Sequence, residues 1–159
     1  MSFEKAKHHF LEGVALLKNE KFQEAETEFL ESLNLLPNRA STLTNLSAVQ
    51  IKLKKFSDAK ITSQQAIRLD ENNNMAYLNL GIIEKEELNI LSAINFFDLS
   101  LKYEANNPEA LLNLGSAHHE LKRYAEAINF YDRAISLKVD YPEVFFNKGM
   151  AYGNPPINN

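Results

Sequence analysis

Four asparagines stand 34 residues apart in this chain, at Asn45, Asn79, Asn113 and Asn147. The asparagine amide offers both a hydrogen-bond donor and an acceptor, which matches one backbone unit of a peptide whatever its side chain. Each such bond adds only about 0.5 to 1.5 kcal/mol, so four of them alone predict weak affinity. The spacing predicts a ladder that holds an extended chain, and a purely structural role is the alternative.

Histidine is the other side chain that could act in catalysis or metal binding. It occurs as two adjacent pairs, His8-His9 and His118-His119. Adjacent residues on a helix point in different directions, whereas a helical metal site uses residues four apart. The sequence has no cysteine, which excludes disulfides, thiolate ligands and a cysteine nucleophile. It also contains no phosphate-binding loop or nucleophile elbow. We therefore expect no catalytic residue, no metal site, no cofactor and no enzymatic activity.

Further columns of residues recur at the same interval and indicate which elements carry these side chains. One column of small residues is Gly13, Gly81, Gly115 and Gly149, with Ser47 in the second unit. A second is Ala25, Ala59, Ala93 and Ala127, and four residues after it come Phe29, Phe97 and Tyr131. A small residue inside a helix lowers the stability of that helix unless a neighbouring element packs against it. Each column therefore predicts close approach by another helix backbone. Each unit is therefore expected to be a helical hairpin.

The order of Leu-Gly, aromatic, Ala and aromatic residues at a period of 34 resembles the tetratricopeptide repeat. The resemblance covers residues 6–152, and residues 108–141 are its nearest copy. It implies an all-α fold, namely a right-handed α-solenoid of stacked helix-turn-helix units with four full repeats and one further helix. The expected units are residues 6–39, 40–73, 74–107, 108–141 and a partial unit 142–153. We expect a single array over residues 1–153 and a flexible tail at 154–159.

Turn-forming residues mark the junctions between units, at Pro37-Asn38, Asn72 to Asn74, Asn106 to Pro108 and Asp140 to Pro142. Pro108 suits the first turn of a helix, and Asn107 is a suitable N-cap. Two places depart from the repeat pattern: Ser63 stands where an aromatic residue is expected, and Leu88-Asn89 replaces a glycine-type turn. Both departures are compatible with a degenerate repeat.

In tetratricopeptide arrays the first helix of each hairpin lines a concave groove that holds peptides. The resemblance places the second, fifth, ninth and twelfth residues of each unit in this groove. The second residues of the four full units are Lys7, Ser41, Met75 and Glu109. With the four asparagines, the expected ligand contacts are Phe10, Val14, Ala48, Leu78, Ile82, Leu112, Ser116 and His119. The set is mainly apolar, and packing between neighbouring helices is the alternative for any one member.

The asparagine column is similar to the asparagine ladder in the repeat domain of O-linked N-acetylglucosamine transferases. Repeat proteins that bind the C-terminal carboxylate of chaperones use a different set: Lys and Asn, then Asn, then Lys with Arg. The matching places here hold Phe10 and Val14, then Asn45, then Met75 and Asn79, so only one of five is present. We expect an internal or apolar segment as the ligand rather than a chaperone tail.

The ends of the array carry charges in a column that is leucine in the interior units. Glu12 and Lys148 stand there, against Leu46, Leu80 and Leu114. The last helix nevertheless carries Phe145, Phe146, Met150 and Tyr152, followed by a break at Gly153 to Pro156. Two interpretations stay open: this helix is a native cap, or the chain is cut from a longer protein. A cut would expose a stacking surface, so a homo-oligomer through the C-terminal partial repeat is a further hypothesis.

Charge and hydropathy limit the classes of partner. The net charge is −4 and the 17 Lys and Arg residues are scattered, which argues against a nucleic-acid partner. No apolar run is long enough for a membrane span or a signal peptide. The absence of cysteine is compatible with a reducing cytoplasm, so cytoplasmic localisation is the default expectation.

The sequence predicts a protein interaction scaffold or adaptor that binds a peptide or helical segment in the concave groove. Two alternatives remain. The chain could be the substrate-recruiting repeat segment of a larger enzyme such as a glycosyltransferase, or a self-assembling repeat module.

Overall fold

The computed structural model describes residues 2–137 and 142–153, and the regular secondary structure in these ranges is entirely helical. The helices are α1 (Ser2–Lys18), α2 (Phe22–Leu35), α3 (Ala40–Lys52), α4 (Phe56–Leu69), α5 (Asn74–Glu86), α6 (Ile90–Tyr103), α7 (Pro108–Glu120), α8 (Tyr124–Leu137) and α9 (Pro142–Tyr152). The predicted all-α class and the predicted helix pairs are confirmed. The junction at Asp140-Tyr141 and the expected tail at 154–159 lie outside the described residues.

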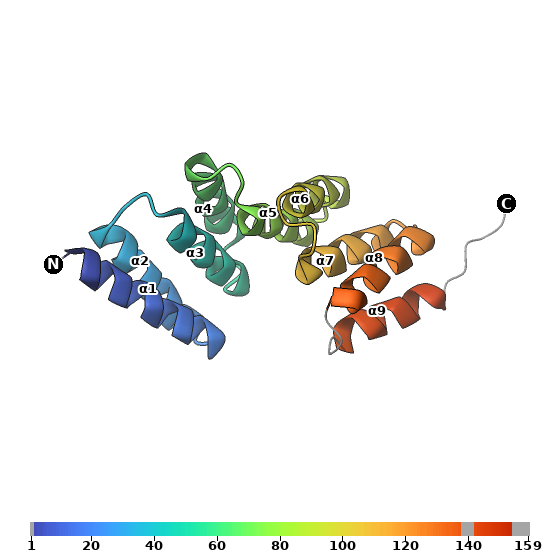
Figure 1. Ribbon diagram of the computed structural model, residues 1–159, viewed down its shortest axis with the longest axis horizontal. Helices are drawn as coiled ribbons and strands as arrows, with labels where there is room; N and C mark the ends of the chain where they lie inside the picture. Colours follow the sequence, from blue (N-terminus) through green and yellow to red (C-terminus); the bar gives the residue numbers. More distant parts are fainter. Residues whose placement is uncertain (1, 138–141, 154–159) are drawn as a thin grey trace. The chain divides into compact units, whose positions relative to one another are not determined.

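The chain packs as two compact units, residues 1–83 and 84–159, and the boundary falls inside α5. In the first unit α1 contacts α2 and α3, and α3 contacts α4. In the second unit α7 contacts α6, α8 and α9, and α8 contacts α9. Figure 1 shows the pairs α1–α2, α3–α4 and α7–α8 as antiparallel hairpins. The expectation of a single array over residues 1–153 stays a prediction.

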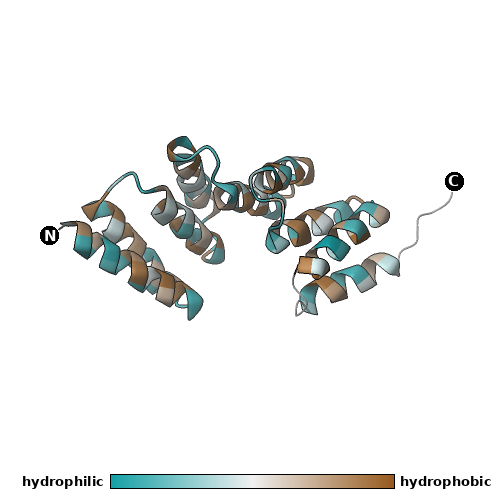
Figure 2. Ribbon diagram, in the orientation of Figure 1, coloured by the Kyte–Doolittle hydropathy of each residue, from teal (hydrophilic) through white to brown (hydrophobic). Residues whose placement is uncertain are grey.

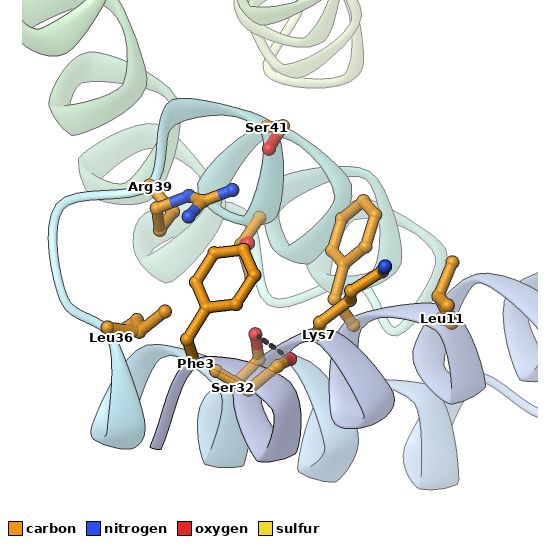
Figure 3. Close-up of a pocket in the computed structure, with 10 residues that line it drawn as sticks. Phe3, Lys7, Leu11, Ser32, Leu36, Arg39 and Ser41 are labelled. Carbon is orange, nitrogen blue, oxygen red and sulfur yellow. Dashed lines mark hydrogen bonds between the residues drawn. The ribbon is translucent and has the colours of Figure 1, made fainter. Parts of the chain in front are cut away.

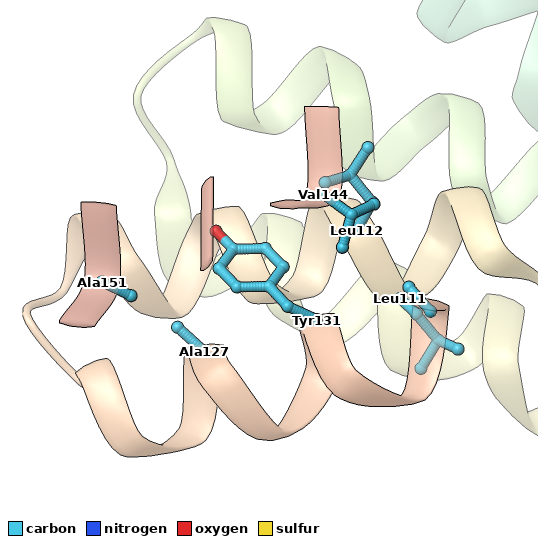
Figure 4. Packing of buried hydrophobic residues seen from close by; sticks show 7 residues of the cluster. Leu111, Leu112, Ala127, Tyr131, Val144 and Ala151 are labelled. Carbon is cyan, nitrogen blue, oxygen red and sulfur yellow. The ribbon is translucent and has the colours of Figure 1, made fainter. Parts of the chain in front are cut away.

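Each unit has its own apolar core, and apolar and polar residues are interspersed along the helices (Figure 2). In the first unit Phe29, Leu46 and Val49 form a buried cluster with Ala25. In the second unit the cluster extends from α7 and α8 to α9 (Figure 4), and its members are Leu111, Leu112, Ala127, Tyr131, Ala134, Val144 and Ala151. Burial of one face of each helix is therefore the main stabilising contribution in both units.

The glycine column lies where a hairpin closes. A Cβ atom added to Gly13 would lie 2.8 Å from the ring of Phe29, and one added to Gly115 would lie 2.5 Å from the ring of Tyr131. The close neighbour is thus an aromatic ring, whereas the sequence analysis expected a helix backbone. The alanine column is also packed tightly, because Ala25, Ala59, Ala93 and Ala127 are all fully buried.

The turn inside each helix pair repeats the same backbone conformation. Glu20, Lys54, Leu88 and Lys122 all have φ between 59° and 63°. The next residue closes the turn: Lys21 N–H donates to the Leu16 carbonyl at 2.9 Å, and the other three turns have the equivalent bond at 2.8 to 2.9 Å. Leu88 adopts the conformation of its counterparts, so its departure from the repeat pattern leaves the turn unchanged.

The junction before α7 shows the predicted cap. Asn107 accepts hydrogen bonds at its side-chain oxygen from the N–H groups of Glu109 and Ala110, at 3.1 and 3.0 Å, and Pro108 occupies the first turn. These bonds satisfy two of the donors that a helix start leaves unpaired. Within the described ranges, none of the helices has both the length and the apolar character needed to cross a membrane.

Candidate functional site

The asparagines of the repeated column differ in their burial and in their hydrogen-bond partners. Asn45 donates its amide N–H to the carbonyl of Ser41 at 2.8 Å, and Asn113 does the same to Glu109 at 2.9 Å. Both bonds run back along the same helix, and both side chains are half-buried. The side-chain oxygen of Asn113 also accepts a bond from Lys85 Nζ at 3.1 Å. These amides therefore have part of their hydrogen-bonding capacity left for a ligand.

Asn79 has a different role. Its side chain is only 3% exposed, and its amide donates to the main-chain carbonyl of Thr44 at 3.1 Å, which joins α5 to α3. A buried amide in such a bond contributes to helix packing and cannot reach a peptide at the surface. Asn79 was expected among the ligand contacts, and its burial removes it from that set. Asn147 is half-buried on α9.

The other expected ligand contacts also differ in how far their side chains are buried. The half-buried members are Phe10, Val14, Ala48, Ile82, Ser116 and His119. Leu78 and Leu112 are buried instead. Leu112 packs in the cluster that joins α7, α8 and α9 (Figure 4). We therefore remove Leu78 and Leu112 from the expected contacts, because their side chains serve the core.

One pocket of about 280 Å³ lies in the first unit, between α1, the end of α2 and the start of α3 (Figure 3). Its lining residues are Phe3, Ala6, Lys7, Phe10, Leu11, Ser32, Leu36, Arg39, Ser41 and Thr42. The volume suits one or two side chains of a bound segment, since pockets for drug-sized ligands begin at about 300 Å³.

Only part of this pocket was predicted. Lys7, Phe10 and Ser41 come from the expected groove columns, whereas Phe3 and Arg39 do not. Phe3 precedes the first expected unit, and Arg39 lies on the connection between two helices.

Leu11 is the lining residue that the sequence could have revealed. It occupies the column that holds asparagine in the later units, 34 residues before Asn45. In the first unit this column is therefore apolar, and Leu11 is exposed at the pocket. A change of residue type in an otherwise regular column was the available signal.

The charges at the pocket are both positive. Lys7 and Arg39 are its charged lining residues. Within the described ranges no salt bridge joins either one to a carboxylate. The Arg39 guanidinium lies 6.0 Å from the centre of the Phe3 ring. At the floor, the Ser32 hydroxyl donates to the carbonyl of Ala6 at 2.9 Å, so this buried polar group is satisfied. The pocket thus combines apolar walls with uncompensated positive charge.

Four titratable groups with shifted pKa values lie in the second unit. The hydrogen bond to Asp132 raises the pKa of Lys148, and burial is the main cause for the other three. Burial lowers the pKa of His118 and raises that of Asp98, and each group partly offsets the shift of the other through its charge. Burial also raises the pKa of Tyr131 to about 12. In the described part of the chain, His, Asp and Glu residues form no group of three or more that could hold a metal ion. These shifts follow from packing and one hydrogen bond, so we assign no chemical step to them.

Two segments of the chain match the tetratricopeptide repeat family, residues 40–73 and residues 108–141. The period, the helical hairpins and the packed small residues agree with this match. The chain is therefore an all-α solenoid that contains tetratricopeptide repeats in these two segments. Comparison with curated proteins gave no match.

Solved structures of repeat proteins show the same fold. A thermophilic tetratricopeptide repeat protein of Thermus thermophilus is 18% identical, with a TM-score of 0.82 over 92% of this chain and 81% of that one. YrrB, a repeat protein described as having an unusual peptide-binding site, is 22% identical, with a TM-score of 0.71 over 91% and 74%.

A third structure contains a bound peptide. The first repeat domain of Spaghetti (RPAP3), bound to the HSP90 peptide SRMEEVD, is 24% identical, with a TM-score of 0.69 over 75% of this chain and 94% of that one. The similarity of the asparagine column to O-linked N-acetylglucosamine transferases stays a prediction.

Proposed function

We propose that the chain is a non-catalytic interaction scaffold that holds a peptide segment along the first helices of its repeats. The observation that carries this proposal is the pocket of the first unit. Its lining includes Lys7, Phe10 and Ser41 from the expected groove columns, and it is apolar, open and positively charged. A peptide side chain that enters it would leave water and contact Phe3, Phe10 and Leu11.

The charges indicate which peptide fits best. Lys7 and Arg39 stand at the pocket without a carboxylate partner among the described residues. An acidic side chain next to the inserted apolar one would pair with them. Such pairs at the rim speed association and fix orientation more than they add affinity. The ligand in this proposal is therefore an internal segment that alternates apolar and acidic residues.

Two further observations support a peptide partner. Asn45 on α3 retains hydrogen-bonding capacity in the same unit as the pocket. Two of the similar structures are described by the peptides or peptide sites they have, and the peptide SRMEEVD is itself acidic with apolar residues. Because the chain has no cysteine, we also propose the cytoplasm as its location.

Fluorescence anisotropy with a short labelled peptide tests the proposal. The probe has a central Leu-Phe pair flanked by glutamates, and a second probe has lysines in place of the glutamates. We expect micromolar affinity for the acidic probe and at least about tenfold weaker binding of the basic one. Leu11→Asp should abolish binding of the acidic probe, since Leu11 is exposed and its loss leaves the core intact.

The matched control is a pair of charge reversals on α1. Lys7→Glu should weaken binding about fivefold, because it places a carboxylate at the pocket. Lys5→Glu changes the net charge equally, is also exposed and lies outside the pocket, so it should leave binding almost unchanged. Equal losses in both variants would mean that the overall charge, and not the pocket, attracts the peptide. No binding of the acidic probe to the unmodified chain would contradict the proposal.

A further inference from the structure

Helix α9 has two apolar faces, and only one of them is covered. Val144 and Ala151, which lie two turns apart, are buried in the cluster with α7 and α8. The opposite side carries four large apolar side chains that remain 50 to 69% exposed, namely Phe145, Phe146, Met150 and Tyr152. An exposed group of this kind on one helix is characteristic of an interaction surface.

Gly149 lies in the middle of this open face. A Cβ atom added there would meet nothing within 4 Å, whereas one added to Gly13 or Gly115 would lie within 2.8 Å of an aromatic ring. The three glycines belong to one sequence column. Gly149 therefore forms a slot of the kind that an aromatic ring fills in two other hairpins, and here the slot is open.

The same face carries an aromatic ring, that of Phe145, which could fill the Gly149 slot of a second copy. Phe145 precedes Gly149 by one helical turn, so the two lie on the same side of α9. If two α9 helices pack antiparallel about a two-fold axis level with residue 147, Phe145 of each copy lies opposite Gly149 of the other. A single symmetry operation then fills both slots, as in an isologous dimer.

We propose that the open face of α9 binds a second copy of this chain through this antiparallel α9–α9 contact. A large aromatic side chain buries about 150 to 250 Å², so the exposed parts of these four residues provide roughly 450 Å² per copy. The pair would bury roughly 900 Å² from these residues, slightly below the ~1,200 Å² of stable interfaces. We therefore expect a weak dimer with a Kd of about ten to a hundred micromolar.

Charge does not oppose this contact. Lys148, the cation nearest the open face, forms a salt bridge with Asp132 of α8, and its Nζ lies 5.5 Å from the centre of the Tyr152 ring. The contact therefore brings together no unpaired lysines. It also uses none of the residues that line the pocket of the first unit.

Sedimentation equilibrium of the full chain from about 2 to 200 µM tests the proposal. We expect the mass to rise from 18.1 kDa toward twice that value with increasing concentration. Gly149→Gln should weaken the dimer at least tenfold, because the side chain blocks the slot, while the helix itself gains propensity. Glu143→Gln places the same residue on an exposed position outside the slot and should leave the dimer unchanged.

Two further measurements test the register. Phe145→Ala should weaken the dimer about tenfold, and Phe146→Ala should have a smaller effect although Phe146 is more exposed. Because the chain has no cysteine, a mixture of the Phe145→Cys and Gly149→Cys variants should form a mixed disulfide faster than either variant forms its own dimer.

Three outcomes would overturn the proposal. The chain could remain monomeric at 200 µM, or it could dimerise equally well with Gln at position 149. It could also stay monomeric while binding a peptide with the sequence of α8, which would assign the face to a different helix.

Discussion

The second and fourth hairpins close at equivalent positions with different chemistry. In α7–α8, Gly115 makes room for the ring of Tyr131, which would come within 2.5 Å of a Cβ atom there. In α3–α4, Ser47 and Ser63 stand at these two positions, and their hydroxyls form a hydrogen bond with each other. Ser47 also lies 3.1 Å from the carbonyl of Ala59. Both serines are fully buried.

The difference shows that Ser47 and Ser63 together form one compensated change in the second unit. Each pair spans 16 residues, so Ser47 and Ser63 replace a glycine and an aromatic ring that touch in the other hairpin. A small polar pair fills less volume, but it satisfies its own hydrogen bonds, which is the condition for burying hydroxyls without loss. The unit to compare between repeats is therefore the contact pair rather than the single column.

The largest expected effect comes from exchanging half of a pair. Ser63→Phe places a ring against the Ser47 side chain, and we expect a loss of about 3 kcal/mol or more in the free energy of unfolding, measured with urea. Adding Ser47→Gly should restore most of it, because the hairpin then has the chemistry of α7–α8. If the double variant is no more stable than Ser63→Phe alone, the two pairs are not interchangeable.

A smaller effect separates the closed slot from the open one. Gly115→Ala should lower the free energy of unfolding by about 1 to 3 kcal/mol, because the new methyl group overlaps the Tyr131 ring. Gly149→Ala should raise it by up to about 1 kcal/mol through helix propensity, since nothing lies within 4 Å of the new atom. The two urea midpoints should move in opposite directions. A shift in the same direction would mean that the ring of Tyr131 yields easily.

The smallest effect concerns pH. His118 in α7 and Gln50 in α3 occupy one column, and burial lowers the pKa of His118, followed by the charge of Arg123. Because the folded pKa lies below the unfolded value of 6.5, His118 contributes stability above pH 6.5 that is lost as the pH falls through its folded pKa.

Thermal unfolding checks this sign. The midpoint of the unmodified chain should fall as the pH decreases from about 7.5 to 5, and His118→Gln, which copies the second hairpin, should fall less. Equal pH dependence in both chains would assign the effect to other groups.

The sequence predicted much of the fold because helix packing leaves periodic traces. The hairpins and the Asn107 cap followed from spacing and residue type alone. The site was predicted less well, since a column assigns a residue to a face of its own helix but does not show what the neighbouring helix covers. Leu78 and Asn79 were therefore expected at the surface and lie in the interior.

The pocket residues that were missed have a related cause. Phe3 and Arg39 lie outside the repeated columns, at the start of α1 and on the connection to α3. A residue outside the repeated columns has no counterpart in the other units, so no pattern in the sequence places it in space. Only the fold brings these residues next to Lys7 and Phe10.

The four positive-φ turns inside the helix pairs have a consequence for local unfolding. A residue other than glycine in this conformation costs about 1 to 2 kcal/mol, and Glu20, Lys54, Leu88 and Lys122 each carry that cost. None of the four is buried, so glycine could replace any one of them without disturbing a packed surface. In a repeat protein stability is roughly a sum over units and their interfaces. A glycine substitution at one of these four turns should therefore stabilise its own hairpin against local unfolding. Amide hydrogen exchange would then become slower in that hairpin and not in the others.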